Sequence, residues 1–110
     1  MEGWYVAKTN RGKNSTAVAN LERWGVETFC PMIRYSDRSR STLEQLFPGY
    51  LFCRFDPDSY LAPIVRWSPG LAYLLGADHG LACLPDEFIN HLKDKISWWN
   101  DGGYKIDFQE

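Results

Sequence analysis

The sequence predicts an α+β sandwich in which helices pack on one antiparallel four-stranded sheet. Stretches that alternate between apolar and polar residues are separated by stretches with helical periodicity, and Pro and Gly lie between them. The order strand, helix, strand, strand, helix, strand, helix is typical of a ferredoxin-like sandwich. The expected elements are strands 4–9, 26–35, 50–55 and 71–75 and helices 14–24, 63–67 and one from 85 onward.

The first strand and the first helix have clear local signals. WYVAKT (residues 4–9) alternates and is rich in residues that favour strands. We expect the helix to be capped by Asn14, Ser15 or Thr16 and to stop at Gly25. Its inner face is expected to be Ala17, Val18, Leu21 and Trp24.

The middle of the chain contains two strands and a polar stretch. VETFCPMIRY (26–35) is a strand broken or bulged at Pro31, and SDRSRSTLEQ (36–45) is a loop or a protruding hairpin tip. Strand 50–55 follows a Pro-Gly turn. Alternation directs Leu51, Cys53 and Phe55 toward the helices, and Tyr50 and Phe52 toward the far face of the sheet. That far face is a binding surface, unless the last helix covers it.

The last third of the chain alternates between short helices and extended pieces. Pro63 suits the first position of a short helix, and residues 71–75 and 81–84 are expected to be extended. The final helix begins after Pro85 with two acidic residues in its first turn, which favours the helix dipole. Its apolar stripe is Phe88, Ile89, Leu92, Ile96 and Trp99.

Composition limits the class of protein. The 110 residues are 45% hydrophobic, enough for one domain with a real core, and no apolar run reaches the ~18 residues that span a bilayer. Without a signal-peptide pattern, we expect a cytoplasmic protein. Cys30, Cys53 and Cys83 are expected to be reduced core thiols. His79 and His91 have no nucleophile at motif spacing, and Gly80 argues against a helix that would bring His79 and Cys83 together, so we expect no enzyme, metal or cofactor.

Charge is unevenly distributed along the chain. The net charge is −2, but residues 1–40 hold seven Lys and Arg against four Asp and Glu. In the first helix Lys13, Thr16, Asn20 and Arg23 form one polar stripe, and Asn10 and Arg11 extend it. Cations bind phosphate and Asn can bond base edges, so the stripe is either a nucleic-acid contact or an ordinary solvated face.

A second possibility is an RNA-binding module. The window 48–55 matches four of the seven specified positions of the motif in RNA-recognition domains, with Tyr50 and Phe52 as the stacking rings. Tyr5 is a candidate partner ring. Pro48 replaces the cation of that motif, and the second half of the chain is acidic.

Four motifs together resemble the N-terminal (NGN) domain of the NusG family of transcription elongation factors. They are WYVAKTNRG, FCPMI, LFPGYLFCRFDP and SPGLAYLLG, and the likeness runs from about Gly3 to Trp98. PMI and the LFPGYLF…FDP run are closest to the specialised RfaH-like branch. The resemblance implies an NGN domain over 1–100, and over 101–110 the start of a linker toward a C-terminal KOW domain outside this sequence.

The resemblance also implies partners. A hydrophobic depression would grip the clamp helices of the RNA polymerase β′ subunit, and another edge would approach the β gate loop. Together these contacts would suppress pausing and termination, while the first helix reads non-template DNA. The matching polymerase positions are Phe47, Tyr50, Phe52 and Leu74, and the matching DNA positions are Asn10, Lys13, Thr16, Asn20 and Arg23, with Arg11 beside them.

Two positions depart from the RfaH-like pattern. Lys8 stands where that branch has a tyrosine in its polymerase patch, and Leu61–Ile64 replaces a polar segment that meets the gate loop.

Overall fold

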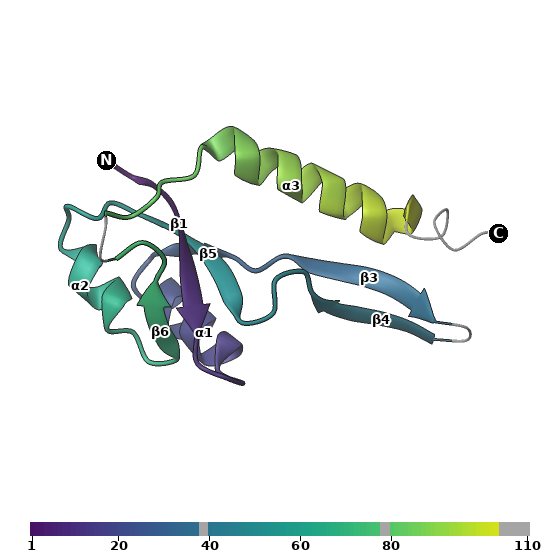
Figure 1. The fold of residues 1–110 in the computed structure, drawn as a ribbon, viewed down its shortest axis with the longest axis horizontal. Coiled ribbons are helices and arrows are strands. Elements are labelled where there is room, and N and C mark those ends of the chain that lie inside the picture. The colour runs from purple at the N-terminus through teal and green to yellow at the C-terminus, as the bar shows by residue number, and fades with distance from the viewer. Residues whose placement is uncertain (38–39, 78–79, 104–110) are drawn as a thin grey trace.

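The computed structural model describes residues 1–37, 40–77 and 80–103 and contains six strands and three helices in that part of the chain (Figure 1). The elements are β1 (Gly3–Thr9), α1 (Asn14–Arg23), β2 (Glu27–Phe29), β3 (Met32–Asp37), β4 (Arg40–Gln45), β5 (Tyr50–Phe55), α2 (Leu61–Arg66), β6 (Leu71–Leu74) and α3 (Asp86–Trp98), followed by a short turn, η1 (Trp99–Gly103). None of the helices described is long and apolar enough to cross a membrane.

Four strands form the predicted antiparallel sheet, in the order β2-β5-β1-β6. The central pair is β1 and β5, which run side by side from Gly3 opposite Phe55 to Lys8 opposite Tyr50. Two edge strands complete the sheet: β2 pairs antiparallel with β5, and β6 pairs antiparallel with β1. The predicted α+β class and four-stranded antiparallel sheet are therefore confirmed.

The main core lies between one face of this sheet and helices α1 and α2. Leu51, Cys53 and Phe55 of β5 point into it, as alternation predicts, and each is almost fully buried. Ala17 and Leu21 reach it from α1, and Val65 reaches it from α2. Burial of these side chains is the main force that holds both helices on the sheet.

Helix α3 packs on the opposite face, so the sheet has a helix on both sides. Ile89 of α3 forms a second buried cluster with Trp4 of β1 and Phe52 of β5. Figure 1 shows α3 running along this face and on over the β3–β4 hairpin. The last helix therefore covers part of the face that bears Phe52.

The C-terminal end of α1 is a Schellman motif. Gly25 has φ +77°, its N–H donates to the Glu22 carbonyl, and the next N–H, from Val26, donates to the Leu21 carbonyl. Gly25 is thus the predicted stop. Trp24 was expected on the inner face, but that expectation is wrong: it is the C-cap residue, outside the last helical turn, and it is 55% exposed.

Two helix starts differ from prediction. Lys13 is the N-cap of α1 and makes no side-chain cap bond, so the capping role expected for residues 14–16 is wrong. Helix α2 begins at Leu61, two residues earlier than expected, and Pro63 is its third residue. Proline is tolerated there because the N–H groups of the first turn have no intrahelical partner.

The stretch from 26 to 45 belongs to two separate sheets. The predicted break at Pro31 divides it: β2 joins the main sheet, while β3 pairs with β4 in a protruding hairpin. The hairpin alternative predicted for 36–45 is the correct one, although residues 38–39 lie outside the described part. Asn100 of η1 accepts from the Arg34 N–H at 2.7 Å and donates to the Met32 carbonyl at 2.9 Å, so η1 occupies an edge of β3.

Candidate protein-binding surface on the open sheet face

The open part of the α3-facing sheet surface is built from two rows of side chains that cross three strands. One row is Phe52, Val6 and Leu75: Phe52 pairs with Val6, and the Leu75 N–H donates to the Val6 carbonyl at 2.9 Å. The next row begins with Tyr50 and Lys8. Residues directly opposite in an antiparallel pair project to the same side, so each row is continuous.

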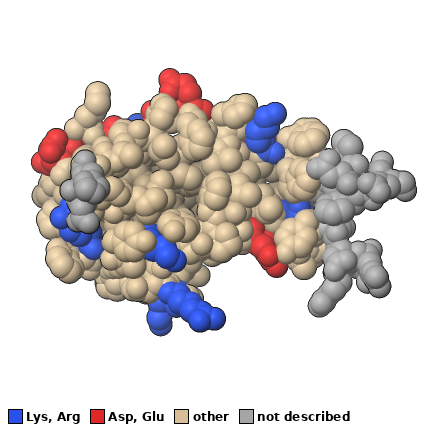
Figure 2. Space-filling model, viewed as in Figure 1, with Lys and Arg blue, Asp and Glu red and all other residues tan. Residues whose placement is uncertain are grey.

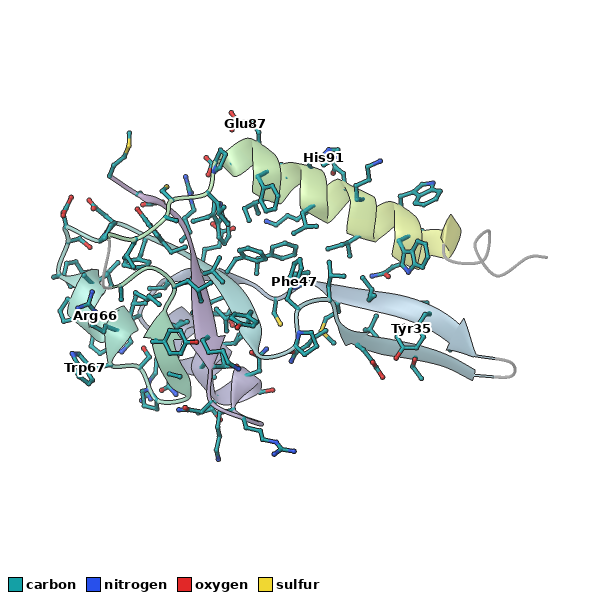
Figure 3. The ribbon with its side chains drawn as sticks, in the orientation of Figure 1. Tyr35, Phe47, Arg66, Trp67, Glu87 and His91 are labelled. Carbon is teal, nitrogen blue, oxygen red and sulfur yellow. The ribbon has the colours of Figure 1, made fainter. Side chains whose placement is uncertain are left out.

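The apolar row is the floor of a depression of ≈ 280 Å³, lined by Val6, Phe47, Tyr50, Phe52 and Leu75. Phe47 comes from outside the sheet. Its ring packs edge-on against that of Phe52, with 6.0 Å between the ring centroids. Figure 3 shows labelled Phe47 beneath α3, at the base of the hairpin. The depression therefore lies where the sheet, the hairpin base and α3 meet.

The Pro-Gly turn positions Phe47 and Tyr50. The Tyr50 N–H donates to the Phe47 carbonyl at 3.0 Å, and Gly49 between them has φ +83°, the pattern of a type II turn. Thr9 fixes the turn to β1, because its N–H and its hydroxyl both donate to the Gly49 carbonyl, at 2.8 and 3.1 Å. Both aromatic rims of the depression thus depend on a turn that the sequence predicts.

Phe52 was expected to face solvent, and that expectation is wrong. It is only 6% exposed, because Ile89 covers it and Phe29 stacks on it at 5.8 Å between ring centroids. Its ring still forms part of the floor. The more accessible lining is Phe47 at 40% and Leu75 at 38% exposed.

Leu74 was also expected in the depression, but it lies in the main core on the opposite face, 3% exposed. The cause is an irregularity in β6: Tyr73 pairs with Lys8, while Leu71 pairs with the adjacent Thr9. Ala72 is therefore an extra residue, a β-bulge that reverses the alternation after it. Leu75 takes the place predicted for Leu74.

A cluster of ion pairs holds the start of α3 against the sheet. Arg54 of β5 bonds Glu2 at 3.1 Å and Asp86 at 3.6 Å. Lys93 of α3 lies 3.9 Å from Glu27 and places its ammonium 5.4 Å from the centre of the Trp4 ring. These cations all have acidic partners.

The polar stripe on α1 lies on the other side of the sheet from the depression, because the helix packs into the main core. Lys13, Thr16 and Arg23 are exposed, and so are Asn10 and Arg11 in the preceding turn. Figure 2 shows blue side chains protruding at the margin where β1 ends and α1 begins in Figure 1.

Two hydrogen bonds affect how available the asparagines of this stripe are to a partner. Asn20 is only partly exposed, and its amide donates to the Thr16 carbonyl of its own helix at 2.9 Å. The Asn10 N–H donates to the Gly70 carbonyl at 2.9 Å, which holds the loop after α2 against the start of α1.

Sequence reasoning missed a second hollow, at the free edge of β6. It has a volume of ≈ 280 Å³, and its lining includes Arg66, Trp67 and Tyr73. Trp67 is 80% exposed and Tyr73 52% (Arg66 and Trp67 are labelled in Figure 3). The sequence carries no local signal for this hollow, because Trp67 was the last residue of the expected helix 63–67; in the structure it is the C-cap of α2.

The thiols differ from the prediction of three core cysteines. Cys53 is fully buried, and burial raises its pKa to about 12. Cys30 is partly buried and Cys83 is exposed, so the core assignment is wrong for Cys83. Burial, together with a hydrogen bond to Cys83, raises the pKa of Tyr5 to about 12.

The residues described contain no group of three His, Cys, Asp or Glu placed to hold a metal ion. His91 is exposed on α3, and His79 lies outside the described residues.

Comparison with known proteins assigns the family. The family model described as transcription termination factor NusG matches residues 2–93. The chain belongs to the NusG family. A solved structure reported as "Domain interaction in Thermotoga maritima NusG" is similar at 25% identity with a TM-score of 0.59, over 79% of this chain. The match covers 52% of the Thermotoga chain, so this NusG-family chain spans about half of it.

The RNA-recognition alternative is not supported. Tyr5 is 5% exposed on the helix-facing side of the sheet, where its ring lies 5.1 Å from that of Phe55. Phe52 lies beneath α3. A stacking platform needs these rings open on one face, and this NusG-family domain keeps both buried.

Proposed function

We propose that this NusG-family chain is a transcription elongation and antitermination factor that docks its depression on the clamp helices of the RNA polymerase β′ subunit. The observation that carries the proposal is the apolar depression lined by Val6, Phe47, Tyr50, Phe52 and Leu75, in a domain of this family. A pair of amphipathic helices is a partner suited to a depression of this kind. Bound there, in the cytoplasm, the domain would suppress pausing and termination.

The depression has the features of a docking site rather than of an enzyme pocket. Its rim is aromatic and partly exposed, and its floor is immobilised by packing against α3. A rigid apolar surface loses little conformational entropy when a partner covers it. Tyr50, which is held by the turn and is only partly buried, is the expected anchor.

The test is a titration with a fragment of the β′ subunit that contains the clamp helices. Tyr50→Ala should weaken binding about 30-fold, since a central aromatic anchor contributes ~2 kcal/mol. Tyr60→Ala is the matched control, because Tyr60 is 74% exposed and does not line the depression. Equal loss in both variants, or none in either, would contradict this docking mode. A parallel titration with single-stranded RNA should show no dependence on Tyr50.

We propose further that the chain belongs to the specialised RfaH-like branch and contacts non-template DNA through the α1 stripe. The stripe lies on the opposite side of the sheet from the depression, so both partners can be held at once. Lys13 and Arg23 are exposed cations suited to phosphate. Replacing both with Ala should flatten the dependence of log affinity on log salt by ~1.4, at ~0.7 per contact with a single strand.

Asn10 and Asn20 are the proposed base-edge contacts in this DNA surface. The Asn20 amide must leave the Thr16 carbonyl before it can read a base, which favours Asn10 as the more available of the two. The assay is binding to paused elongation complexes with different non-template sequences. Equal discrimination by the wild type and Asn10→Ala would exclude a reading role for Asn10.

Contacts with the β gate loop at Leu61–Ile64, and a KOW domain beyond residues 101–110, remain predictions. Leu61 and Ala62 pack against the main core, and the first four residues of α2 are all apolar or proline, so a gate-loop contact there would be hydrophobic.

A further inference from the structure

Lys8 is a cation at the margin of the apolar depression. It lies on central strand β1, between Tyr50 on β5 and Tyr73 on β6 in the same cross-strand row. Its ammonium lies 5.1 Å from the centre of the Tyr50 ring. The neighbouring row is the floor of the depression, so this charge faces whatever enters there.

The turn leaves room for this ammonium. A Cβ atom at Gly49 would lie 2.6 Å from the Lys8 Nζ, too close for an ordinary contact. Glycine is also required by the positive φ of the turn. Gly49 therefore shapes the rim of the depression and also leaves space for the Lys8 side chain to lie along that rim.

Lys8 differs from the other cations on this sheet face. Beneath and beside α3, Arg54 is paired with Glu2 and Asp86, and Lys93 is paired with Glu27. No ion pair involves Lys8 within residues 1–37, 40–77 and 80–103. Among the described residues, carboxylates therefore pair with the cations where α3 is docked, and none pairs with Lys8 beside the open depression.

We propose that Lys8 selects a partner helix that carries a carboxylate beside its apolar face, and that this Asp or Glu pairs with Lys8 when the helix fills the depression. The inference rests on the proposed docking function and identifies the charge that its partner must supply. Covering the depression removes water from the Lys8 ammonium, and an unpaired charge at such an interface is unfavourable. A partner with Lys or Arg at that point is repelled, so Lys8 acts on specificity as well as affinity.

The experiment uses the full 110-residue chain and the β′ clamp-helix fragment, at two salt concentrations. Lys8→Met keeps the aliphatic stem without the charge and should weaken binding about fivefold, and Lys8→Glu about 30-fold, as expected for a close charge pair. Lys95→Glu makes the same change in net charge at an exposed position on α3 that does not line the depression. It should leave affinity within twofold. Thermal unfolding of each variant verifies that it is folded.

A charge exchange identifies the partner residue. Each Asp and Glu of the fragment is replaced in turn with Lys, and one of these fragments should bind the Lys8→Glu chain at least tenfold more tightly than the original fragment does. If Lys8→Glu and Lys95→Glu bind equally well while Tyr50→Ala loses binding, the role of Lys8 is overturned and the docking function stands. If the unchanged chain does not bind the fragment, the docking function fails, and the Lys8 inference fails with it.

Discussion

Leu74 and Leu75 are adjacent in the chain, and the structure predicts opposite consequences when each is replaced with Ala. Leu74 is 3% exposed in the main core, whereas Leu75 is 38% exposed and lines the depression. The β-bulge at Ala72 determines which leucine faces which side. The pair therefore tests the bulge and the location of the site together.

The magnitudes follow from burial. Leu74→Ala leaves a cavity in a close-packed core and should lower the free energy of unfolding by 2–5 kcal/mol, on the order of 10–20 °C in melting temperature for a domain of this size. Leu75→Ala removes a side chain that is already one-third exposed, so the stability loss should be ~1 kcal/mol. Binding would cover that exposed third, and full burial of a leucine is worth ~1.5–3 kcal/mol. Leu75→Ala is thus expected to lose ~1 kcal/mol of binding free energy, which is about fivefold in affinity.

The assay is chemical denaturation of both variants, followed by titration of each folded protein with the clamp-helix fragment. Leu74→Ala should bind with unchanged affinity per folded molecule, and Leu75→Ala should be nearly as stable as the original chain. The reverse result, with Leu75→Ala strongly unfolded and Leu74→Ala defective in binding, would refute the bulge and the assignment of Leu75 to the depression.

Three further predictions concern stability and reactivity. Phe52→Ala should lower the free energy of unfolding by 3–5 kcal/mol, since the ring is buried beneath α3; a urea titration that shows no loss would contradict this packing. Gly70→Ala should destabilise by more than ~1 kcal/mol, because φ is +91° and a Cβ would lie 2.8 Å from α1 backbone; an unchanged melting temperature would argue against this close approach. At pH 8 the thiol of Cys83 should be alkylated first and that of Cys53 last, because burial raises the pKa of Cys53 to about 12 and keeps it protonated below that pH; mass spectrometry of the modified peptides gives the order.

The parts of the candidate site that sequence predicts correctly depend on neighbouring residues. Pro48 and Gly49 define a tight turn, and the alternation from Tyr50 onward directs Leu51 into the core. Strand alternation also places Tyr50 on the opposite face, because turn geometry and strand periodicity are properties of a few consecutive residues. Phe47 was expected at the depression only from the family resemblance.

Errors in the site arise from contacts between distant segments. Phe52 is buried by Ile89, which lies 37 positions later in the chain, and strand alternation contains no information about where a later helix docks. Trp67 shows the converse: it is a large aromatic side chain at the C-cap of α2, and it is 80% exposed. The role proposed for Lys8 depends on its contacts with Tyr50 and Gly49, and on its having no acidic partner among the residues that the structure describes.

The sequence by itself determined the order of the four main-sheet strands and the three helices, the break at Pro31, the stop at Gly25 and the core-facing side of β5. Each of these depends on backbone preferences and periodicity that act within one element. Only the tertiary structure decided that α3 covers part of the second sheet face, and that one extra residue at Ala72 sends Leu74 inward and leaves Leu75 in the depression. Both depend on how separate segments pack and pair. Apolar surface is buried only when two segments come into contact, so the free energy gained cannot be assigned to one stretch of the chain.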